Sequence, residues 1–270
     1  MSDSLTKIRN LVPILDCDLV CYRVGFACEK DEPIENVLHS VKLVVANALA
    51  PFANKAELYI SGKGNFRNDI AVTKPYKGNR VDTPKPQYYN EIREYLINVK
   101  GAIPTDGIEP DDMQGIRQYE LKGKGCIVSI DKDMKMIKGW HYNFVKQEAF
   151  FVDGLSADRW FFTQLLTGDP TDNIQGIPKV GPKTAEKLLN AGASPEEWLA
   201  ICEQEYQRYY GEDEWQSKLS EMAGLLWILR KRDTPCPWVR TRLTRAAHDV
   251  RPMESQSPAP FMDDELPTTL

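Results

Sequence analysis

The sequence predicts an α/β fold, in which helices flank a parallel β-sheet, followed by a region that is wholly helical. Two observations lead to this prediction. Short apolar runs separated by helical stretches occur early in the chain, and such runs are typical of buried parallel strands. After residue 156 only helical patterns follow. We expect an α/β core at 1–155 that includes a basic segment at 62–86, a helical region at 156–251, and a disordered proline-rich tail at 252–270.

Composition and cysteine usage fit a soluble protein of a reducing, cytoplasmic compartment. The chain has 270 residues, of which 42% are hydrophobic and 27% charged. No apolar stretch approaches the roughly 18 residues that a membrane span requires, and the N-terminus lacks the pattern of a signal peptide. The six cysteines are scattered without a CxxC pair, and only three histidines accompany them, so neither a zinc site nor a disulfide framework is predicted. We therefore expect no membrane partner.

The net charge of -5 hides a segregated distribution of charge. Six bases and two acids lie between residues 63 and 85, and seven bases and two acids lie between residues 230 and 251. Between these stretches, residues 106–112 hold four acids and no base. This pattern favours a negatively charged pocket, to which the flanking basic segments would bring a polyanion.

Three apolar runs are the expected strands, at residues 11–16, 56–61 and 125–131. Two of them end in an aspartate, Asp16 and Asp131. Because active sites of α/β sheets form at the carboxyl ends of the strands, we expect these two aspartates on one edge of the sheet.

Helical patterns fill the rest of the chain. The stretch 35–50 carries apolar residues at helical spacing, which favours a core helix, and Ser156 is the expected N-cap of the first helix of the helical region. The segment 62–86 has glycines, prolines and bases without periodicity, so we expect a long, mobile excursion. The predicted helices are 18–29, 35–50, 87–100, 111–121, 156–167, 182–190, 195–210 and 214–231.

Eight carboxylates from four segments fall where the sheet would bring them together. Each pair taken alone is explained as a helix cap or a solvated turn. Together they predict a site for hard divalent cations, and Mg²⁺ or Mn²⁺ fits better than Zn²⁺ because no histidine or cysteine belongs to the set. Two such ions can activate a water and stabilise the leaving oxygen of a phosphodiester. The eight are Asp16, Glu109, Asp111, Asp112, Asp131, Asp133, Asp169 and Asp172.

A glycine-rich turn follows the last acidic pair. Glycine allows backbone N–H groups to approach a phosphate, and Pro182 suits the first position of a helix whose N-terminus favours an anion. Such a turn binds duplex backbone without reading sequence, although a plain packing corner between two helices is the alternative. Three lysines recur at a spacing of four on one face, Lys179, Lys183 and Lys187.

Five motifs in order along the chain resemble the structure-specific 5′ nuclease superfamily. They are ILDCD, PYKGNR, EPDDM, SIDKDM, and GDPTDN with the lysine-rich turn that follows it. This superfamily contains flap endonucleases, the 5′-nuclease domain of bacterial DNA polymerase I, and short bacteriophage 5′ to 3′ exonucleases. The resemblance spans residues 11–189 and implies a PIN-like sheet and a helix-three-turn-helix at 169–190.

The resemblance implies metal-dependent hydrolysis of DNA phosphodiesters near 5′ ends, by an exonuclease or flap endonuclease acting in replication, primer removal or recombination. The implied cofactors are two or more Mg²⁺ ions, with Mn²⁺ as a substitute, and K⁺ bound by backbone carbonyls near Val180 and Gly181. The implied partners are DNA with a 5′ end or 5′ flap and RNA–DNA primers. With no polymerase region, the chain resembles stand-alone phage or bacterial enzymes.

The resemblance also assigns roles to residues. The eight carboxylates would hold the metals directly or through water, with Asp16 and Asp111 counted among the catalytic residues. Tyr76, Lys77 and Arg80 would belong to a helical arch over the site, where Lys77 reaches the scissile phosphate and Arg80 shares its helical face. The implied DNA-binding residues are Tyr76, Lys77, Arg80, Gly176, Lys179, Gly181, Lys183, Thr184 and Lys187.

Two departures from the superfamily pattern bear on the site. Ser61 and Gly62 stand where many relatives carry a strand-end aspartate, and without that acid one metal site would be weaker or assembled differently. Asp18 is a candidate substitute or a helix cap. Lys179 stands where relatives usually have a glycine, which adds a charge and puts the backbone geometry in question.

Two other functions fit the same residues. A non-catalytic DNA-binding protein on this fold is favoured by the missing strand aspartate and disfavoured by the retained acids. A small metal-dependent ribonuclease is disfavoured by the long helical continuation. The acidic end at 261–267 is a candidate docking segment for a replication protein, although acidic tails are more often merely solvated.

Overall fold

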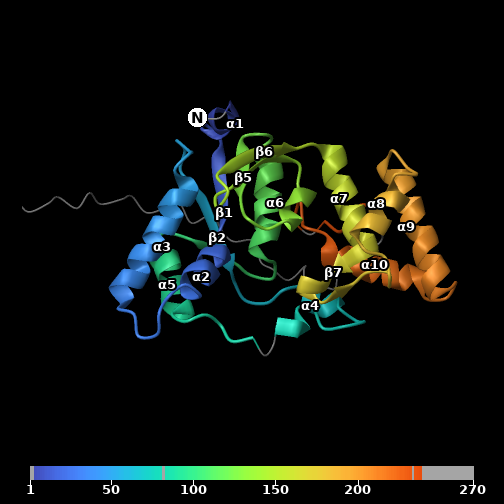
Figure 1. The fold of residues 1–270 in the computed structure, drawn as a ribbon, viewed down its shortest axis with the longest axis horizontal. Helices are drawn as coiled ribbons and strands as arrows, with labels where there is room; N and C mark the ends of the chain where they lie inside the picture. The colour runs from blue at the N-terminus through green and yellow to red at the C-terminus, as the bar shows by residue number, and fades with distance from the viewer. Residues whose placement is uncertain (1–2, 81–82, 233, 239–270) are drawn as a thin grey trace, which may run out of the picture.

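A computed structural model describes residues 3–80, 83–232 and 234–238 of the chain. In these residues a six-stranded sheet has helices on both faces, and the last helices gather beside it (Figure 1). The sheet order is β3-β2-β1-β4-β5-β6. The prediction of an α/β sheet followed by a helical region is confirmed. The strands are β1 Val12–Asp16, β2 Glu57–Ser61, β3 Ile103–Thr105, β4 Gly125–Val128, β5 Gly139–Asn143 and β6 Glu148–Val152.

The sheet is mixed, whereas the sequence predicted a parallel one. The first five strands in the sheet order are parallel, and β6 runs antiparallel to β5. The loop 144–147 is too short for a parallel crossover, so β5 and β6 form a hairpin. The prediction missed β3, β5 and β6 because β3 has only three residues and the other two strands mix polar with aromatic side chains. The predicted strand 125–131 ends at Val128, which leaves Asp131 in the turn beyond it.

Alternating strand residues build two cores. Leu15 and Val128 face α2, α3 and α5, while Ile14 and Ile127 face α6 and the helical region. Val41 and Val45 of α3 are buried, which confirms the prediction that this helix belongs to the core. The helices named here are α2 Asp18–Gly25, α3 Ile34–Leu49, α5 Tyr89–Asn98 and α6 Pro110–Glu120, preceded by α1 Asp3–Ile8.

The helical region shares its core with the sheet. Phe161 and Leu165 of α7 pack in the same cluster as Ile127. Asp153, not Ser156, is the N-cap of α7: the backbone N–H of Ser156 donates to Asp153 Oδ1 at 2.9 Å. The last helix ends earlier than the predicted residue 231. The helices are α7 Gly154–Thr167, α8 Pro182–Leu189, α9 Pro195–Tyr210 and α10 Trp215–Leu226.

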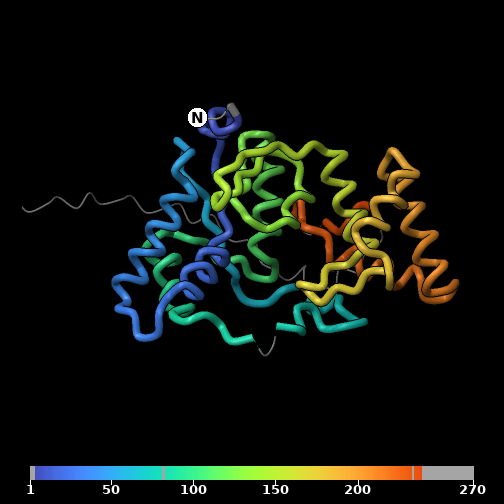
Figure 2. Tube along the Cα trace, in the orientation of Figure 1, coloured from blue at the N-terminus to red at the C-terminus, as the bar shows by residue number. Residues whose placement is uncertain are grey.

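Residues 67–80 of the basic segment 62–86 pack against the helical region, and the expected mobility of the segment stays a prediction. Figure 2 shows residues 67–80 as a cyan tube that runs beside α10 and the yellow turn at 168–176, whereas residues 83–86 lead toward α2 and α5. Glu221 of α10 accepts hydrogen bonds from the backbone N–H groups of Val72 and Thr73, at 2.7 and 2.5 Å. In the described residues, the only helical turns of the segment 62–86 are α4 Arg67–Ile70 and the 3₁₀ turn η1 Gly78–Arg80. The segment is therefore not the helical arch that was expected. We call residues 62–80 the arch segment.

The described residues contain no helix that is both long enough and apolar enough to cross a membrane. The predicted disordered tail at 252–270, its acidic end at 261–267 and the basic residues beyond Trp238 lie outside the described residues.

Candidate active site

The sheet topology brings the predicted acids to one edge. Asp16 ends β1, the acids 109–112 open α6 after β3, and Asp131 and Asp133 follow β4. The last acidic pair lies on a small two-stranded turn after α7, made of β7 Gly168–Asp169, the 3₁₀ turn η3 Pro170–Asp172 and β8 Ile174–Gln175. The carboxyl ends of parallel strands converge, so segments far apart in sequence meet here.

Four of the eight acids line one small cavity. Asp111, Asp133, Asp169 and Asp172 line a space of about 20 Å³ together with seven other residues, Arg67 among them, and the space is enough for one water-sized sphere. The donors are all carboxylate oxygens, which suit a hard divalent cation. Within the described ranges, no three His, Cys, Asp or Glu side chains are arranged to hold a metal ion as they stand. The chemistry of the set therefore fits a cation, while the carboxylates would have to draw together around it.

Asp16 and Asp111 carry charge that the protein does not balance. Burial, and then the charge of Asp18, raises the pKa of Asp16 well above its usual value. Burial, and then the charges of Glu109 and Asp112, raises the pKa of Asp111 in the same way. Lys77 acts to lower both pKa values, and Arg67 acts more strongly to lower that of Asp111, but burial and the neighbouring acids outweigh them. Desolvated carboxylates that repel one another need an added positive charge, so these residues fit a bound cation.

Asp133 is a third buried carboxylate whose negative charge is not balanced by nearby positive charge. Burial, followed by the charge of Asp131, raises the pKa of Asp133 to about 7. Two residues that the sequence analysis did not select contact it: Lys132 Nζ lies 3.4 Å from Asp133 Oδ1 and 3.6 Å from Asp169 Oδ1, and Gln164 Nε2 donates to Asp133 Oδ1 at 2.5 Å. Lys132 could have been selected from the sequence, because it lies between two predicted ligands, Asp131 and Asp133. No pattern in the sequence pointed to Gln164.

The side chain of Asp18, the first residue of α2, lies beside the end of β2, where this chain lacks the acid that the superfamily pattern usually has. Its Oδ2 accepts hydrogen bonds from the backbone N–H of Ser61, at 3.2 Å, and from the Ser61 hydroxyl. Its backbone N–H donates to Asp16 Oδ1 at 2.8 Å. Its Oδ1 is buried and has no hydrogen-bond partner in the described residues. Its side chain does not cap α2, so the reading of Asp18 as a substitute acid is the better supported of the two.

The three predicted arch residues reach two of the acids. The Tyr76 hydroxyl lies 2.7 Å from Glu109 Oε2 and 2.9 Å from Asp172 Oδ2. Lys77 forms an ion pair with Glu109, and its Nζ lies 3.7 Å from Asp172 Oδ2. Arg80 Nη2 lies 2.5 Å from Asp172 Oδ1. These contacts occupy carboxylate oxygens that a metal ion would otherwise use.

The backbone places Lys77 differently from the predicted helical arrangement. Lys77 has a φ of 53°, in the left-handed region, and precedes η1, so it does not share a helical face with Arg80. Its backbone N–H donates to the carbonyl of Asp172 at 2.9 Å. The arch segment is thus joined to the acidic turn through main chain as well as side chains.

The nearby lysine and arginine side chains change the pKa values of Glu109 and Asp172 to different extents. Burial opposes ionisation of Glu109, but Arg67 and Lys77 outweigh it and lower its pKa. For Asp172, burial raises the pKa, and Lys77 and Arg80 offset only part of this.

Asp112 is the predicted ligand that the structure takes away from the cavity. It is fully buried, and Arg67 grips its two oxygens at 2.6 and 2.8 Å. Arg67 is a site residue that the sequence analysis passed over as one base in a basic stretch. No feature of the stretch around Arg67 distinguishes a buried arginine from a solvated one, because its side-chain partners lie 42 to 160 residues away.

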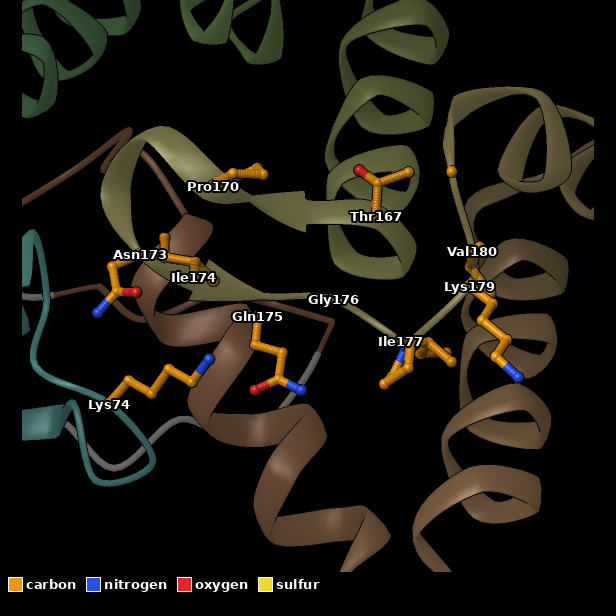
Figure 3. A pocket seen from close by; sticks show the side chains of 12 residues that line it. Lys74, Thr167, Pro170, Asn173, Ile174, Gln175, Gly176, Ile177, Lys179 and Val180 are labelled. Atoms are coloured by element: carbon orange, nitrogen blue, oxygen red, sulfur yellow. The ribbon is translucent and has the colours of Figure 1, made fainter. Parts of the chain in front are cut away.

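The glycine-rich turn borders a groove of about 640 Å³ on the other side of the acidic turn, with Lys74 of the arch segment opposite (Figure 3). Lys179 has a φ of 67°, so it adopts the left-handed conformation expected of the glycine it replaces. Gly181 faces open space and can admit a close ligand. Gly176 is buried instead, and a Cβ there would lie 2.1 Å from the carbonyl carbon of Thr167. The glycine at 176 is therefore required by chain packing, not by approach to a phosphate.

The remaining predicted DNA-binding residues lie on one exposed face of α8. Lys183, Thr184 and Lys187 are exposed, while Ala185 and Leu189 on the opposite side are buried in the core. The helical spacing thus predicted correctly which side of α8 faces solvent.

Comparison with known sequences identifies relatives. No family model matches the chain. It is 32% identical over 209 residues to a 5′–3′ exonuclease of Buchnera aphidicola subsp. Schizaphis graminum, covering 68% of this chain and 71% of that protein. A second 5′–3′ exonuclease, of Buchnera aphidicola subsp. Acyrthosiphon pisum, is 30% identical over 204 residues, covering 67% of this chain and 71% of that protein. A thermostable DNA polymerase I of Thermus thermophilus is 25% identical over 213 residues, which cover 71% of this chain and 25% of the polymerase.

Solved structures share the fold. A bacteriophage T5 flap endonuclease solved with DNA and metal ions superposes with a TM-score of 0.50 at 16% identity, covering 80% of this chain and 98% of that one. The catalytic core of Rad2 in complex with DNA gives a TM-score of 0.50 at 13% identity, covering 80% and 72%. The sequence matches over two thirds of the chain and this shared fold agree with the geometry described above, and the chain belongs to the 5′–3′ exonuclease family.

Proposed function

We propose that this chain is a metal-dependent 5′ to 3′ exonuclease and flap endonuclease, which hydrolyses DNA phosphodiesters near 5′ ends. The observation that carries the proposal is the cavity lined by Asp111, Asp133, Asp169 and Asp172, next to the unbalanced charge of Asp16. Acids from four segments with oxygen donors alone suit Mg²⁺, with Mn²⁺ as a substitute. The two Buchnera relatives are 5′–3′ exonucleases, which supports the same activity.

The residues that would hold the metal are the four cavity acids together with Asp16, Glu109, Asp18 and, at the exposed rim, Asp131. Bound there, divalent ions supply an activated water and a Lewis acid for the leaving oxygen. Lys77 and Arg80 lie beside the same acids, from which they can turn to the phosphate oxygens as negative charge develops on them. Tyr76 would keep Glu109 and Asp172 in place through its hydroxyl.

The helix-three-turn-helix would hold the duplex that delivers the scissile bond. Lys179, Lys183 and Lys187 with Thr184 present one exposed face to the phosphate backbone, and the open position at Gly181 allows the strand to come close. K⁺ bound by the carbonyls of 180–181 belongs to the same proposal. The acidic turn at 168–175 is followed within a few residues by the helix-three-turn-helix. This short connection would fix the distance between the duplex-binding surface and the site of cleavage.

The substrates we propose are DNA with a 5′ end or a 5′ flap, including RNA–DNA primers, during replication, primer removal or recombination. The non-catalytic alternative rested on the missing acid at Ser61, and Asp18 lies hydrogen-bonded to that residue. The ribonuclease alternative leaves the exposed lysine face of α8 without a role.

The purified protein tests this proposal on three 5′-labelled substrates: a flap, a nick and a blunt duplex, each with Mg²⁺, Mn²⁺ or a chelator. Cleavage is expected with either metal and none with the chelator, and the ranking of the substrates separates exonuclease from flap-endonuclease preference. Asp213→Asn, at an exposed acid between α9 and α10, is the matched control for substitutions in the site. A parent protein that cleaves no substrate in either metal would refute the enzyme proposal.

A further inference from the structure

Arg67 lies at the base of the arch segment with only 2% of its surface exposed. Every nitrogen of its guanidinium donates a hydrogen bond. Nε donates to the carbonyl of Leu225 at 2.9 Å and Nη2 donates to the carbonyl of Trp227 at 2.7 Å. Nη1 and Nη2 also donate to the two oxygens of Asp112, at 2.6 and 2.8 Å. A buried charge with this many matched acceptors is fixed in one orientation.

Asp112 has no oxygen lone pair left for a further ligand. Its Oδ1 accepts from Arg67 and from the backbone N–H of Leu229, at 3.0 Å. Its Oδ2 accepts from Arg67 and from the backbone N–H of Glu109, at 3.2 Å. A carboxylate offers about four acceptor positions, and here all four are filled. A metal ion could bind Asp112 only by displacing one of these donors.

The same guanidinium reaches a second acid. Arg67 Nη1 lies 3.3 Å from Glu109 Oε2, the oxygen that also contacts the Tyr76 hydroxyl. The three acids at the start of α6 therefore differ in how they contact Arg67. Asp112 is its buried partner and Glu109 is held at its edge, while Asp111 lines the cavity, as Arg67 itself does, and accepts the backbone N–H of Asp112 at 2.8 Å.

Arg67 also joins three parts of the chain. It belongs to α4, Asp112 belongs to α6, and the carbonyls it binds lie at the end of α10 and just beyond. One side chain therefore fixes the acids of the sheet edge relative to both the arch segment and the helical region.

We propose that Arg67 is a positioning residue of the metal site and that Asp112 lies outside the set of metal ligands, an inference that rests on the proposed metal-dependent function. Arg67 orients Glu109 toward the metal, and Asp112 balances the charge of Arg67. Groups that hydrogen-bond to a metal ligand from behind typically contribute about 10- to 100-fold to metal affinity.

Three variants test the two halves of this proposal. Asp112→Asn removes the charge of Asp112 while keeping an oxygen acceptor. Asp111→Asn is the comparison at a cavity acid. The double variant Arg67→Met/Asp112→Leu removes one positive and one negative charge, so the net charge of the site is unchanged and any change in metal affinity reports orientation. Replacing both partners of a buried pair with apolar residues often preserves the fold, unlike removal of one.

A second double variant supplies a matched control. Arg117, at the other end of α6, grips Glu57 with two contacts of 2.7 Å. Arg117→Met/Glu57→Leu removes an arginine–carboxylate pair that joins α6 to β2 and is less buried, without touching the acids of the site. Its Mn²⁺ affinity should equal that of the parent.

The measurement is Mn²⁺ binding without DNA, by titration calorimetry and electron paramagnetic resonance, below the melting temperature of each variant. We expect Asp112→Asn to bind as many ions as the parent, though more weakly because the charge of Arg67 is then unbalanced. Asp111→Asn and the Arg67→Met/Asp112→Leu variant should bind about tenfold more weakly or worse. An ion lost from Asp112→Asn would place Asp112 among the ligands. Parental affinity in the folded Arg67→Met/Asp112→Leu variant would remove the positioning role. A parent that binds no Mn²⁺ would instead contradict the proposed function.

Discussion

The two sides of the acidic site differ in how their charge is balanced. On the arch side, Glu109 and Asp172 contact Tyr76, Lys77 and Arg80. On the strand side, Asp16 and Asp111 face mainly other acids. Glu109 and Asp111 are two residues apart, yet the pKa of Glu109 is lowered, against burial, by Arg67 and Lys77, whereas burial and neighbouring acids raise that of Asp111.

This difference indicates what a metal ion would do on each side. On the strand side it would add a positive charge that the protein lacks. On the arch side it would compete with Lys77 and Arg80 for carboxylate oxygens, and the displaced side chains would then be available to a phosphate. The four predictions below test this contrast, from the largest expected effect to the smallest.

Asp111→Asn should reduce cleavage by about a thousandfold or more, because it weakens metal binding worth several kcal/mol in the transition state. DNA binding should be largely intact. The melting temperature of the metal-free variant should rise, because the substitution removes an unbalanced charge from the strand side. Cleavage assays, DNA binding and thermal unfolding in chelator measure the three effects. A lower melting temperature, beside an unchanged Asp213→Asn control, would show that the charge of Asp111 is balanced after all.

Lys77→Ala should lower kcat by about a hundredfold or more, with a smaller change in KM, since the lysine acts on charge that develops in the transition state. Single-turnover kinetics on the flap substrate separate the two effects. Lys63→Ala, at an exposed lysine of the same arch segment, is the control and should behave like the parent. A larger effect on KM than on kcat would make Lys77 a binding residue only.

The metal-free protein should lose stability as the pH rises from about 6.5 to 8. The folded-state pKa of Asp133 is about 7, against 3.8 unperturbed, and those of Asp16 and Asp111 are also raised. Acids with raised folded pKa values favour the folded state when protonated, so their contribution falls as pH climbs through those values. The loss should be on the order of 1–2 kcal/mol. Burial lowers the pKa of His141 to about 4, so this group opposes the trend only below about pH 6.5.

Thermal unfolding across this pH range, with and without Mg²⁺, checks that prediction. Mg²⁺ should remove the decline, because it balances the ionised acids, and Asp133→Asn should flatten it. A stability that increases between pH 6.5 and 8 without metal would contradict the assignment of unbalanced charge to the strand side.

Mg²⁺ without DNA should loosen the arch segment. If the ion takes oxygens of Glu109 and Asp172, amide hydrogen exchange at residues 76–80 should become faster by a few fold, the reverse of the usual protection by a ligand. The N–H groups of Val72 and Thr73, bound to Glu221, are the internal control and should not change. Protection of residues 76–80 by Mg²⁺ would mean that metal and arch do not compete.

The sequence by itself determined the ingredients of the site. Apolar runs ending in acids predicted strand ends, because a buried strand must be apolar and its end must return to solvent. The spacing of Lys183 and Lys187 predicted one exposed face of α8, since helical periodicity is a local property. The motifs around Asp16, Asp111 and Asp172 predicted a shared acidic site for the same reason: each is short and complete within its own segment.

Tertiary structure alone decided which charges are balanced. Asp18 meets Ser61 across 43 residues, and Arg67 meets Asp112 across 45, so the partner of each charge depends on how distant segments pack. The hairpin of β5 and β6 likewise depends on pairing, which is non-local. Burial removes a charge from water and makes its energy depend on its nearest partners, and those partners exist only once the chain has folded.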